Sequence, residues 1–206
     1  MESTVKLSIL QNINQGKVFR FPYPHLVIPE ALNQTLYDEL ERTYPSVEVC
    51  AGDQEIGNNM RYQVSANEAL ESKTLSEAWL SFIDYHTSQA FYDEVMRIFG
   101  RHCKPFIGRK AAVRGRGQEG VQLDCQPGVN SPVTEVSSVK GPHLDNHKEL
   151  YAGLLYMRLK DDDSSGGDLE IYKAKRRQKW IHKKVYDPSL FRVRKTVPYT
   201  KNQFVL

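Results

Sequence analysis

Residues 151–172 read Tyr-Ala-Gly-Leu-Leu-Tyr-Met-Arg-Leu-Lys-Asp-Asp-Asp-Ser-Ser-Gly-Gly-Asp-Leu-Glu-Ile-Tyr, and this stretch decides the fold class. Its first part, residues 151–158, is largely apolar, which suits a buried strand. Acids, serines and two glycines then occupy residues 161–167, and residues 168–172 are strand-like again. The stretch therefore predicts two strands joined by a solvated hairpin turn.

The same pattern of short strands and turns extends through the second half of the chain. Short β-rich segments are separated by Gly, Pro or Asn, and no helical period of useful length occurs among them. The further predicted strands are Val121–Cys125, Val133–Val139, Lys183–Tyr186, Phe191–Val197 and Gln203–Leu206. Many short strands with turn signals between them are typical of a β-sandwich, jelly roll or barrel.

The first half of the chain predicts helices. Leu32, Leu36 and Leu40 recur every four residues, which predicts a helix from Pro29 to about Tyr44. Residues 74–100 carry a capping-box pattern and one broad apolar face, so we expect a second helix there, ending at a glycine. Residues 17–28 suggest an edge strand, and residues 46–68 a polar loop.

One histidine, His86, lies on the apolar face of the second predicted helix. A lone histidine in such a place is more often a core residue whose ring nitrogens are hydrogen-bonded than a ligand, so we leave it out of the site.

Size and composition predict one domain. The chain has 206 residues, 40% of them hydrophobic, which is enough for a single core. We expect a single domain over residues 1–206, with residues 1–106 as helical support and 107–206 as the β core. The sequence shows neither a secretory signal nor a membrane-spanning run, and its three cysteines lack zinc-site spacing. These features predict a cytoplasmic protein with free thiols and no membrane association.

A short motif precedes residues 151–172: Gly141-Pro142-His143-Leu144-Asp145-Asn146. On a strand, side chains at positions i and i+2 point to the same face. An imidazole and a carboxylate can then converge on one metal ion, so we predict that His143 and Asp145 are metal ligands. The alternative is a surface loop with an ordinary His–Asp hydrogen bond.

Taken in order, these segments resemble the Fe(II)/2-oxoglutarate-dependent dioxygenases, specifically the prolyl-4-hydroxylase-like branch. The matching residues are Cys125-Gln126-Pro127-Gly128, Pro142-His143-Leu144-Asp145-Asn146, Leu155-Tyr156-Met157-Arg158 and Gly166-Gly167-Asp168-Leu169-Glu170-Ile171-Tyr172. The resemblance covers roughly residues 121–206. It implies an α+β fold in which a double-stranded β-helix (jelly-roll) core carries an N-terminal helical layer.

The resemblance also implies roles for single residues. His143 and Asp145 match two ligands of a 2-His-1-carboxylate triad. Tyr156 matches a tyrosine whose hydroxyl bonds the distal carboxylate of 2-oxoglutarate, Gln126 matches a polar position directed at that cosubstrate, and Leu169 matches an apolar wall. The implied reaction is O2-dependent C–H hydroxylation coupled to decarboxylation of 2-oxoglutarate to succinate. Fe(II), 2-oxoglutarate and ascorbate are the expected cofactors, and a small molecule or a protein side chain is the expected substrate.

The third ligand is missing from this match. Asn202–Leu206 matches the start of the strand that leads to the family's distal histidine, and the chain ends inside an apolar run. We therefore expect the last core strands to lie beyond residue 206, and the chain as written to bind Fe(II) poorly and to be inactive alone. His147 and His182 are weaker alternatives for the third ligand. A cupin-like centre would use an H-x-H pair, and Asp145 argues against it.

Charge suggests a rival function. Between Lys173 and Lys195 there are ten Lys or Arg residues and one acid, Asp187, so this segment is expected to attract an anionic partner unless it is only a solvated loop. The rival is therefore a non-catalytic jelly-roll binding module. A G-x-G-x-x-G match at residues 115–120 does not predict a dinucleotide site, because a predicted strand follows it instead of a helix.

Overall fold

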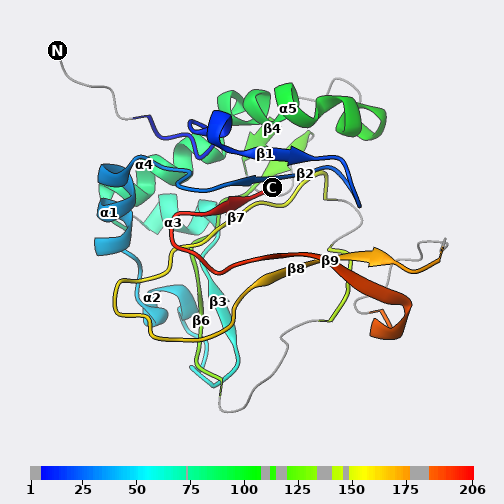
Figure 1. Ribbon diagram of the computed structural model, residues 1–206. Helices are drawn as coiled ribbons and strands as arrows, with labels where there is room; N and C mark the ends of the chain where they lie inside the picture. The colour runs from blue at the N-terminus through cyan, green and yellow to red at the C-terminus, as the bar shows by residue number, and fades with distance from the viewer. Residues whose placement is uncertain are drawn as a thin grey trace. The chain divides into compact units, whose positions relative to one another are not determined.

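A computed structural model describes residues 6–72, 74–107, 112–114, 120–133, 141–145, 149–176 and 186–206 (Figure 1). The helices are η1 (Ile13–Gln15), α1 (Gln34–Arg42), α2 (Val47–Ala51), α3 (Ala66–Ser72), α4 (Glu77–His86), α5 (Gln89–Ile107) and η2 (Pro188–Leu190). The strands are β1 (Lys17–Phe19), β2 (His25–Ile28), β3 (Arg61–Gln63), β4 (Ala112–Arg114), β5 (Val121–Leu123), β6 (Gly128–Asn130), β7 (Leu154–Leu155), β8 (Leu169–Ala174), β9 (Phe191–Val197) and β10 (Phe204–Val205). The predicted α+β class is confirmed.

Contacts divide the chain into two compact units. The first unit contains Met1–Asn12 and Ala31–Glu135, and the second contains Ile13–Glu30 and Val136–Leu206. All five α-helices and the strands β3 to β6 belong to the first unit, and the remaining strands belong to the second. The expected single domain, with its support ending at residue 106, stays a prediction.

In the first unit, helix α1 begins at a polar cap. The side chain of Asn33 accepts a hydrogen bond from the backbone N–H of Leu36, which satisfies one of the free donors at the helix start. The predicted start at Pro29 was wrong, because the cap at Asn33 lies four residues further along. The leucine stripe was read correctly, since Leu36 and Leu40 are both buried.

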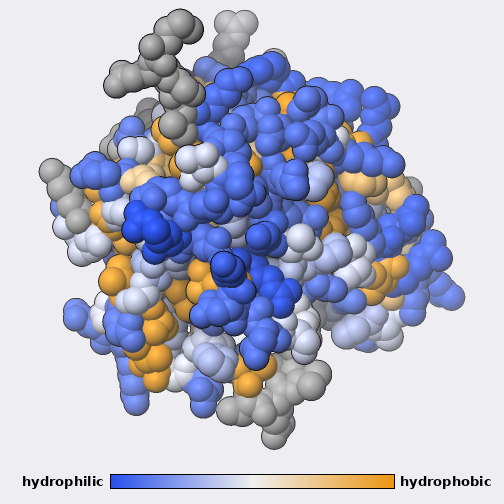
Figure 2. All heavy atoms as spheres, turned by 60° about the vertical axis from the view of Figure 1, so that its left-hand side comes forward, coloured by the Kyte–Doolittle hydropathy of each residue, from blue (hydrophilic) through white to orange (hydrophobic). Residues whose placement is uncertain are grey.

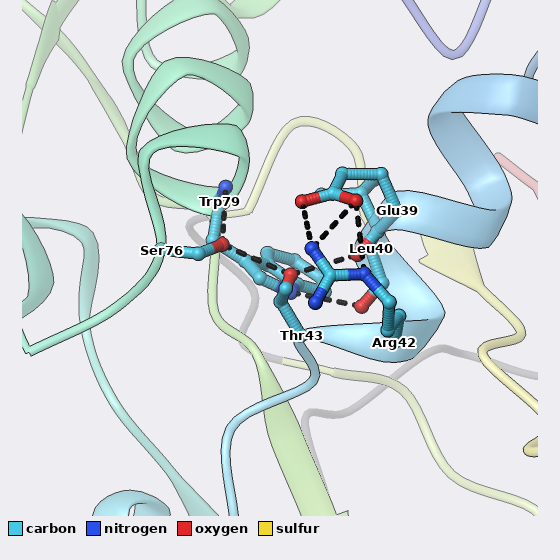
Figure 3. Close-up of polar contacts among 6 residues, drawn as sticks. All are labelled: Glu39, Leu40, Arg42, Thr43, Ser76 and Trp79. Atoms are coloured by element: carbon cyan, nitrogen blue, oxygen red, sulfur yellow. Dashed lines mark hydrogen bonds and ion pairs between the residues drawn. The ribbon is translucent and has the colours of Figure 1, made fainter.

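The end of α1 is tied to the start of α4 by side-chain hydrogen bonds (Figure 3). The indole Nε1–H of Trp79 donates to the carbonyl of Leu40 at 3.0 Å. The hydroxyl of Ser76 donates to the Thr43 hydroxyl at 2.9 Å and accepts from the backbone N–H of Trp79. Ser76 is thus both the cap of α4 and its link to α1, so the capping-box assignment to Thr74 was displaced by two residues.

The long helix predicted over residues 74–100 is two helices. Thr87 and Ser88 interrupt it, because their hydroxyls donate back to the carbonyls of Ile83 at 2.8 Å and Tyr85 at 2.6 Å. Such bonds let Ser and Thr compete with the helical ladder. Helix α5 then runs past the glycine at position 100 that was expected to end the helix.

His86 is the core residue that the sequence predicts. It is 4% exposed, its Nδ1 donates to the Phe82 carbonyl at 2.7 Å, and its Nε2 accepts from the backbone N–H of Ile9 at 3.1 Å. Both nitrogens are satisfied by a neutral ring. Burial accordingly lowers the pKa of His86 to about 4.

Residues 46–68, predicted as loop, contain α2, β3 and the start of α3. Strand β3 pairs antiparallel with β6, and Tyr62 in its centre is buried with its hydroxyl donating to the carbonyl of Glu55. The pairing joins segments more than 60 residues apart, so the local sequence carried no signal for it. Strand β5 runs parallel to β4. As predicted, a strand and not a helix follows the G-x-G-x-x-G match.

The second unit contains two antiparallel arrays. One is a four-stranded sheet in the order β1-β2-β10-β7, and the other is the hairpin of β8 and β9 (Figure 1). Strand β9 has the bounds predicted for residues 191–197, whereas β7 is confined to two residues of the predicted 151–158. The predicted strands over residues 133–139 and 183–186 lie almost wholly outside the described residues.

Side chains from both arrays of the second unit meet in one apolar cluster. Ile171 of β8, Val197 of β9 and Val205 of β10 are its buried members. Val27 of β2 and Leu169 of β8 pack against them. Burying a side chain of this size stabilises a fold by about 1.5–3 kcal/mol, so this cluster holds the hairpin to the sheet.

Gly153 sits beside the ring of Phe204. A Cβ atom at this glycine would lie 2.8 Å from two ring carbons of Phe204, which is itself buried in β10. The absence of a side chain at residue 153 therefore allows β7 and β10 to pair with a large ring next to the ladder.

We expect the free energy of unfolding to fall between about pH 6.5 and pH 4 because of His86. The unfolded imidazole binds a proton below pH 6.5, whereas the buried one resists protonation until about pH 4. The full effect of this group is about 3 kcal/mol. Denaturant unfolding of wild type and His86→Gln at pH 7.5 and 5.0 measures it, and an equal loss in both proteins would contradict it.

We expect Gly153→Ala to destabilise the chain by about 1–3 kcal/mol, because the new methyl group overpacks against Phe204. Gly57→Ala is the matched control, since its nearest neighbour, Met60 Cγ, is at an ordinary 3.7 Å. Thermal unfolding monitored by circular dichroism compares the two variants. Equal midpoints would show that the close approach at Gly153 does not constrain the sheet.

Candidate metal centre

The face of the molecule in Figure 2 is mainly hydrophilic, and its apolar side chains lie in small separate groups, as on most monomeric proteins. Within the described ranges, no helix is both long and apolar enough to cross a bilayer. The H-x-D motif is therefore the first candidate for a functional site.

The described part of the motif is residues 141–145, in the second unit. It is not part of a strand: the backbone bends at Pro142. Its position is held by a hydrogen bond from the backbone N–H of Tyr186 to the Pro142 carbonyl at 2.7 Å. The strand expected here is absent from the described residues, but the two side chains of the motif still converge.

The geometry of His143 and Asp145 suits a cation. His143 Nε2 lies 3.3 Å from Asp145 Oδ1, and His143 Nδ1 lies 2.8 Å from the carbonyl of Gly141. Because a carbonyl only accepts, Nδ1 carries the proton. In a neutral ring Nε2 then carries a lone pair, which points at a carboxylate oxygen. A proton or a cation between these two atoms relieves their repulsion.

The separation matches that of two neighbouring metal ligands. Metal–ligand bonds of about 2.1 Å at right angles place the ligand atoms about 3 Å apart. Histidines that bind metals commonly donate their second ring N–H to a carbonyl, as His143 does to Gly141. The side chains of His143 and Asp145 are 29% and 55% exposed, so an ion can reach them.

Tyr23 is a neighbour that the motif did not predict. It lies in the loop between β1 and β2, and burial together with the Asp145 carboxylate raises the pKa of its phenol. Its carbonyl accepts from His25 Nδ1 at 2.8 Å. His25 is 2% exposed, and its Nε2 has no hydrogen-bond partner in the described structure. No sequence signal links these residues to Asp145, more than a hundred positions away.

Tyr156 also lies in the second unit, just after β7. It is buried against Tyr199, and its hydroxyl donates to the Gly167 carbonyl at 3.4 Å. Burial and then the nearby Asp168 carboxylate raise the pKa of Tyr156 to about 12. The phenol is therefore a neutral donor, and its assignment to a cosubstrate stays a prediction.

The other two predicted site residues have different surroundings. Leu169 packs against the apolar cluster of Ile171, Val197 and Val205. Gln126 belongs to the first unit, where its amide oxygen accepts from Gln63 at 2.5 Å and its amide nitrogen donates to Asp124 at 2.8 Å. Whether Gln126 and Leu169 share a site with His143 stays a prediction.

A third metal ligand has not been located. His147 and His182 lie outside the described residues, and within those residues no group of three His, Cys, Asp or Glu side chains is placed to hold a metal ion. Cys50, Cys103 and Cys125 are free thiols, as predicted. Burial raises the pKa of each thiol, which makes them poor thiolate ligands at neutral pH.

Comparisons with protein-family models, with curated proteins and with solved structures found no match to this chain.

Proposed function

We propose that this chain carries the core of a non-haem Fe(II) and 2-oxoglutarate-dependent dioxygenase that hydroxylates C–H bonds. One observation carries the proposal: His143 Nε2 and Asp145 Oδ1 lie 3.3 Å apart, with Nδ1 bonded to Gly141. An imidazole and a carboxylate held in this way are two of the three protein ligands in the facial triad of such enzymes.

The second unit supports the proposal through its architecture. A jelly roll consists of two antiparallel sheets packed face to face, and the described strands supply a four-stranded sheet and a hairpin that share one apolar cluster. The order of the segments along the chain, from the H-x-D motif through β7 to β8, is the order of the resemblance.

The residues of this chain would divide the work. His143 and Asp145 would hold the iron, which supplies O2 activation when it is bound. Tyr156 would donate its neutral hydroxyl to a cosubstrate carboxylate, because a phenol whose pKa is about 12 stays protonated at pH 7. Leu169 would form part of an apolar wall that excludes water. The substrate is a small molecule or a protein side chain.

A second candidate function is a jelly-roll module that binds an anionic partner without catalysis. The strands β8 and β9 favour it, because Lys173, Arg194 and Lys195 project from them without a described acidic partner. Binding of an anion that persists in His143→Ala, together with no metal-dependent turnover, would favour this function.

We expect His143→Ala and Asp145→Ala each to weaken binding of Fe(II), added anaerobically, by at least about ten-fold. Each change removes one of the two ligand atoms that converge in the structure. His102→Ala and Asp161→Asn are matched controls, because both residues are exposed and lie outside the motif. Isothermal titration calorimetry measures the affinities. Equal affinities in all four variants would contradict the assignment of the pair.

We expect a metal ion at this pair to lower the pKa of Tyr23. The Asp145 carboxylate raises that pKa, so neutralising it by Asp145→Asn or by bound Zn²⁺ must shift it downward. NMR titration of ring-¹³C tyrosine reports the shift, with Tyr23→Phe to assign the signal. A pKa that is insensitive to both changes would show that Tyr23 and Asp145 are not neighbours.

We expect Fe(II) and 2-oxoglutarate, mixed anaerobically with the complete protein, to produce a metal-to-ligand charge-transfer band, and admission of O2 to produce succinate. Both signals should disappear in His143→Ala. Absorption spectroscopy and succinate quantification test this, with Asp161→Asn as the control. Absence of the band and of succinate in wild type would contradict the proposed reaction while leaving the metal-binding prediction to its own test.

A further inference from the structure

The second unit gathers four cations around two phenylalanine rings. We call this surface the cation–aromatic face. Its residues are Lys17 and Phe19 of β1, Phe21 of the following loop, Lys173 of β8, and Arg194 and Lys195 of β9. They come from segments more than 150 positions apart, so the fold places Phe19 and Phe21 beside cations of the basic segment at 173–195.

Contacts with the rings define the face. The Nζ atoms of Lys195 and Lys17 lie 3.6 Å and 5.2 Å from the centre of the Phe19 ring. Lys173 Nζ lies 4.3 Å, and Arg194 Cζ 5.9 Å, from the centre of the Phe21 ring. All four distances are within the range of cation–π attraction, which positions the long side chains.

A bulge explains why neighbouring side chains of β9 serve the same face. Ile171 pairs with Lys195 and Tyr172 with Val193, so Arg194 is an extra residue in the ladder. A bulge breaks the strict alternation of side chains between the two faces of a strand. Arg194 and Lys195 can therefore both approach rings of the β1 segment.

Four positive charges lie together on this face. Among the described residues, none of these four cations forms a salt bridge to an acid. Glu170 of β8 accepts a hydrogen bond from Tyr172. Burial and the neighbouring Lys17 lower the pKa of Lys195, as expected where like charges are held together. A site built in this way favours a polyanion.

The exposed ring of Phe21 indicates which class of anion this face can bind. Phe21 is 48% exposed even though cations flank its ring. The Phe19 ring is covered on one side by His25, which stacks on it at 4.8 Å and 8°. Phe19 therefore holds lysines in place, whereas Phe21 offers an open apolar surface between charges.

We propose that the cation–aromatic face binds single-stranded nucleic acid, with phosphates against the four cations and an unpaired base against Phe21. Alternation of cations with an exposed ring is the pattern of single-strand binding surfaces. A duplex keeps its bases stacked away from such a ring, and an acidic peptide would use the cations but not the ring. The proposal does not depend on a metal at His143.

Fluorescence anisotropy with labelled oligo(dT) and an abasic oligomer of equal length separates stacking from charge. We expect tighter binding of oligo(dT), with a log–log salt slope of about −3 for four phosphate contacts. Phe21→Leu keeps the apolar bulk but removes the aromatic face, and should weaken oligo(dT) about ten-fold while leaving the abasic oligomer unchanged. The double variant Lys17→Gln/Lys195→Gln should weaken both oligomers and reduce the slope by about 1.4.

Matched controls come from the same unit. Lys160→Gln and Lys201→Gln remove exposed cations away from the face and should change affinity little. Thermal unfolding checks that each variant is folded, and quenching of emission in Phe21→Trp by oligo(dT) alone gives a second readout of stacking. Equal affinity for both oligomers, tighter binding of duplex, or no effect of Phe21→Leu would overturn the proposal.

Discussion

Strand β10 is hydrogen-bonded along both of its edges, and the second unit depends on this. Phe204 and Val205 pair with β2 on one side and with β7 on the other. Reciprocal backbone bonds between Leu26 and Leu206, at 2.7 Å and 3.0 Å, extend the ladder. Without this strand the β1–β2 hairpin would have no partner in the sheet. Tyr23 would then not be held near Asp145, nor Phe21 near Lys173 and Arg194.

Local patterns in the sequence predicted local features well. The leucine stripe at residues 32–40 predicted α1, and the β-rich composition of residues 191–197 predicted β9 with its observed bounds. Both signals lie within one element. The break between α4 and α5 was missed because it depends on how Thr87 and Ser88 bond to preceding carbonyls, a choice that residue type alone does not decide.

In the candidate site, too, local features were predicted and contacts between distant segments were not. The proximity of His143 and Asp145 was predicted, but from a strand that the structure does not form at residues 141–145. The bond from Nδ1 to the Gly141 carbonyl was not predicted, because it depends on the bend at Pro142. Tyr23 and the cation–aromatic face could not be predicted, because strand pairing over long separations leaves no local signature. The pairing of β10 with β2 holds the β1–β2 hairpin in the sheet. This hairpin carries both Tyr23, beside the candidate metal site, and Phe21 of the cation–aromatic face.

The pairing of β10 along both edges also affects how the chain folds during its synthesis. The β1–β2 hairpin is synthesised well before its partner in the sheet, residues 204–205. At typical rates of synthesis, the roughly 175 residues between them take about 10 to 35 seconds. Throughout that interval the edge of β2 that β10 later covers is an unpaired strand edge, open to wrong partners. We therefore expect the nascent chain to need protection by chaperones during this interval.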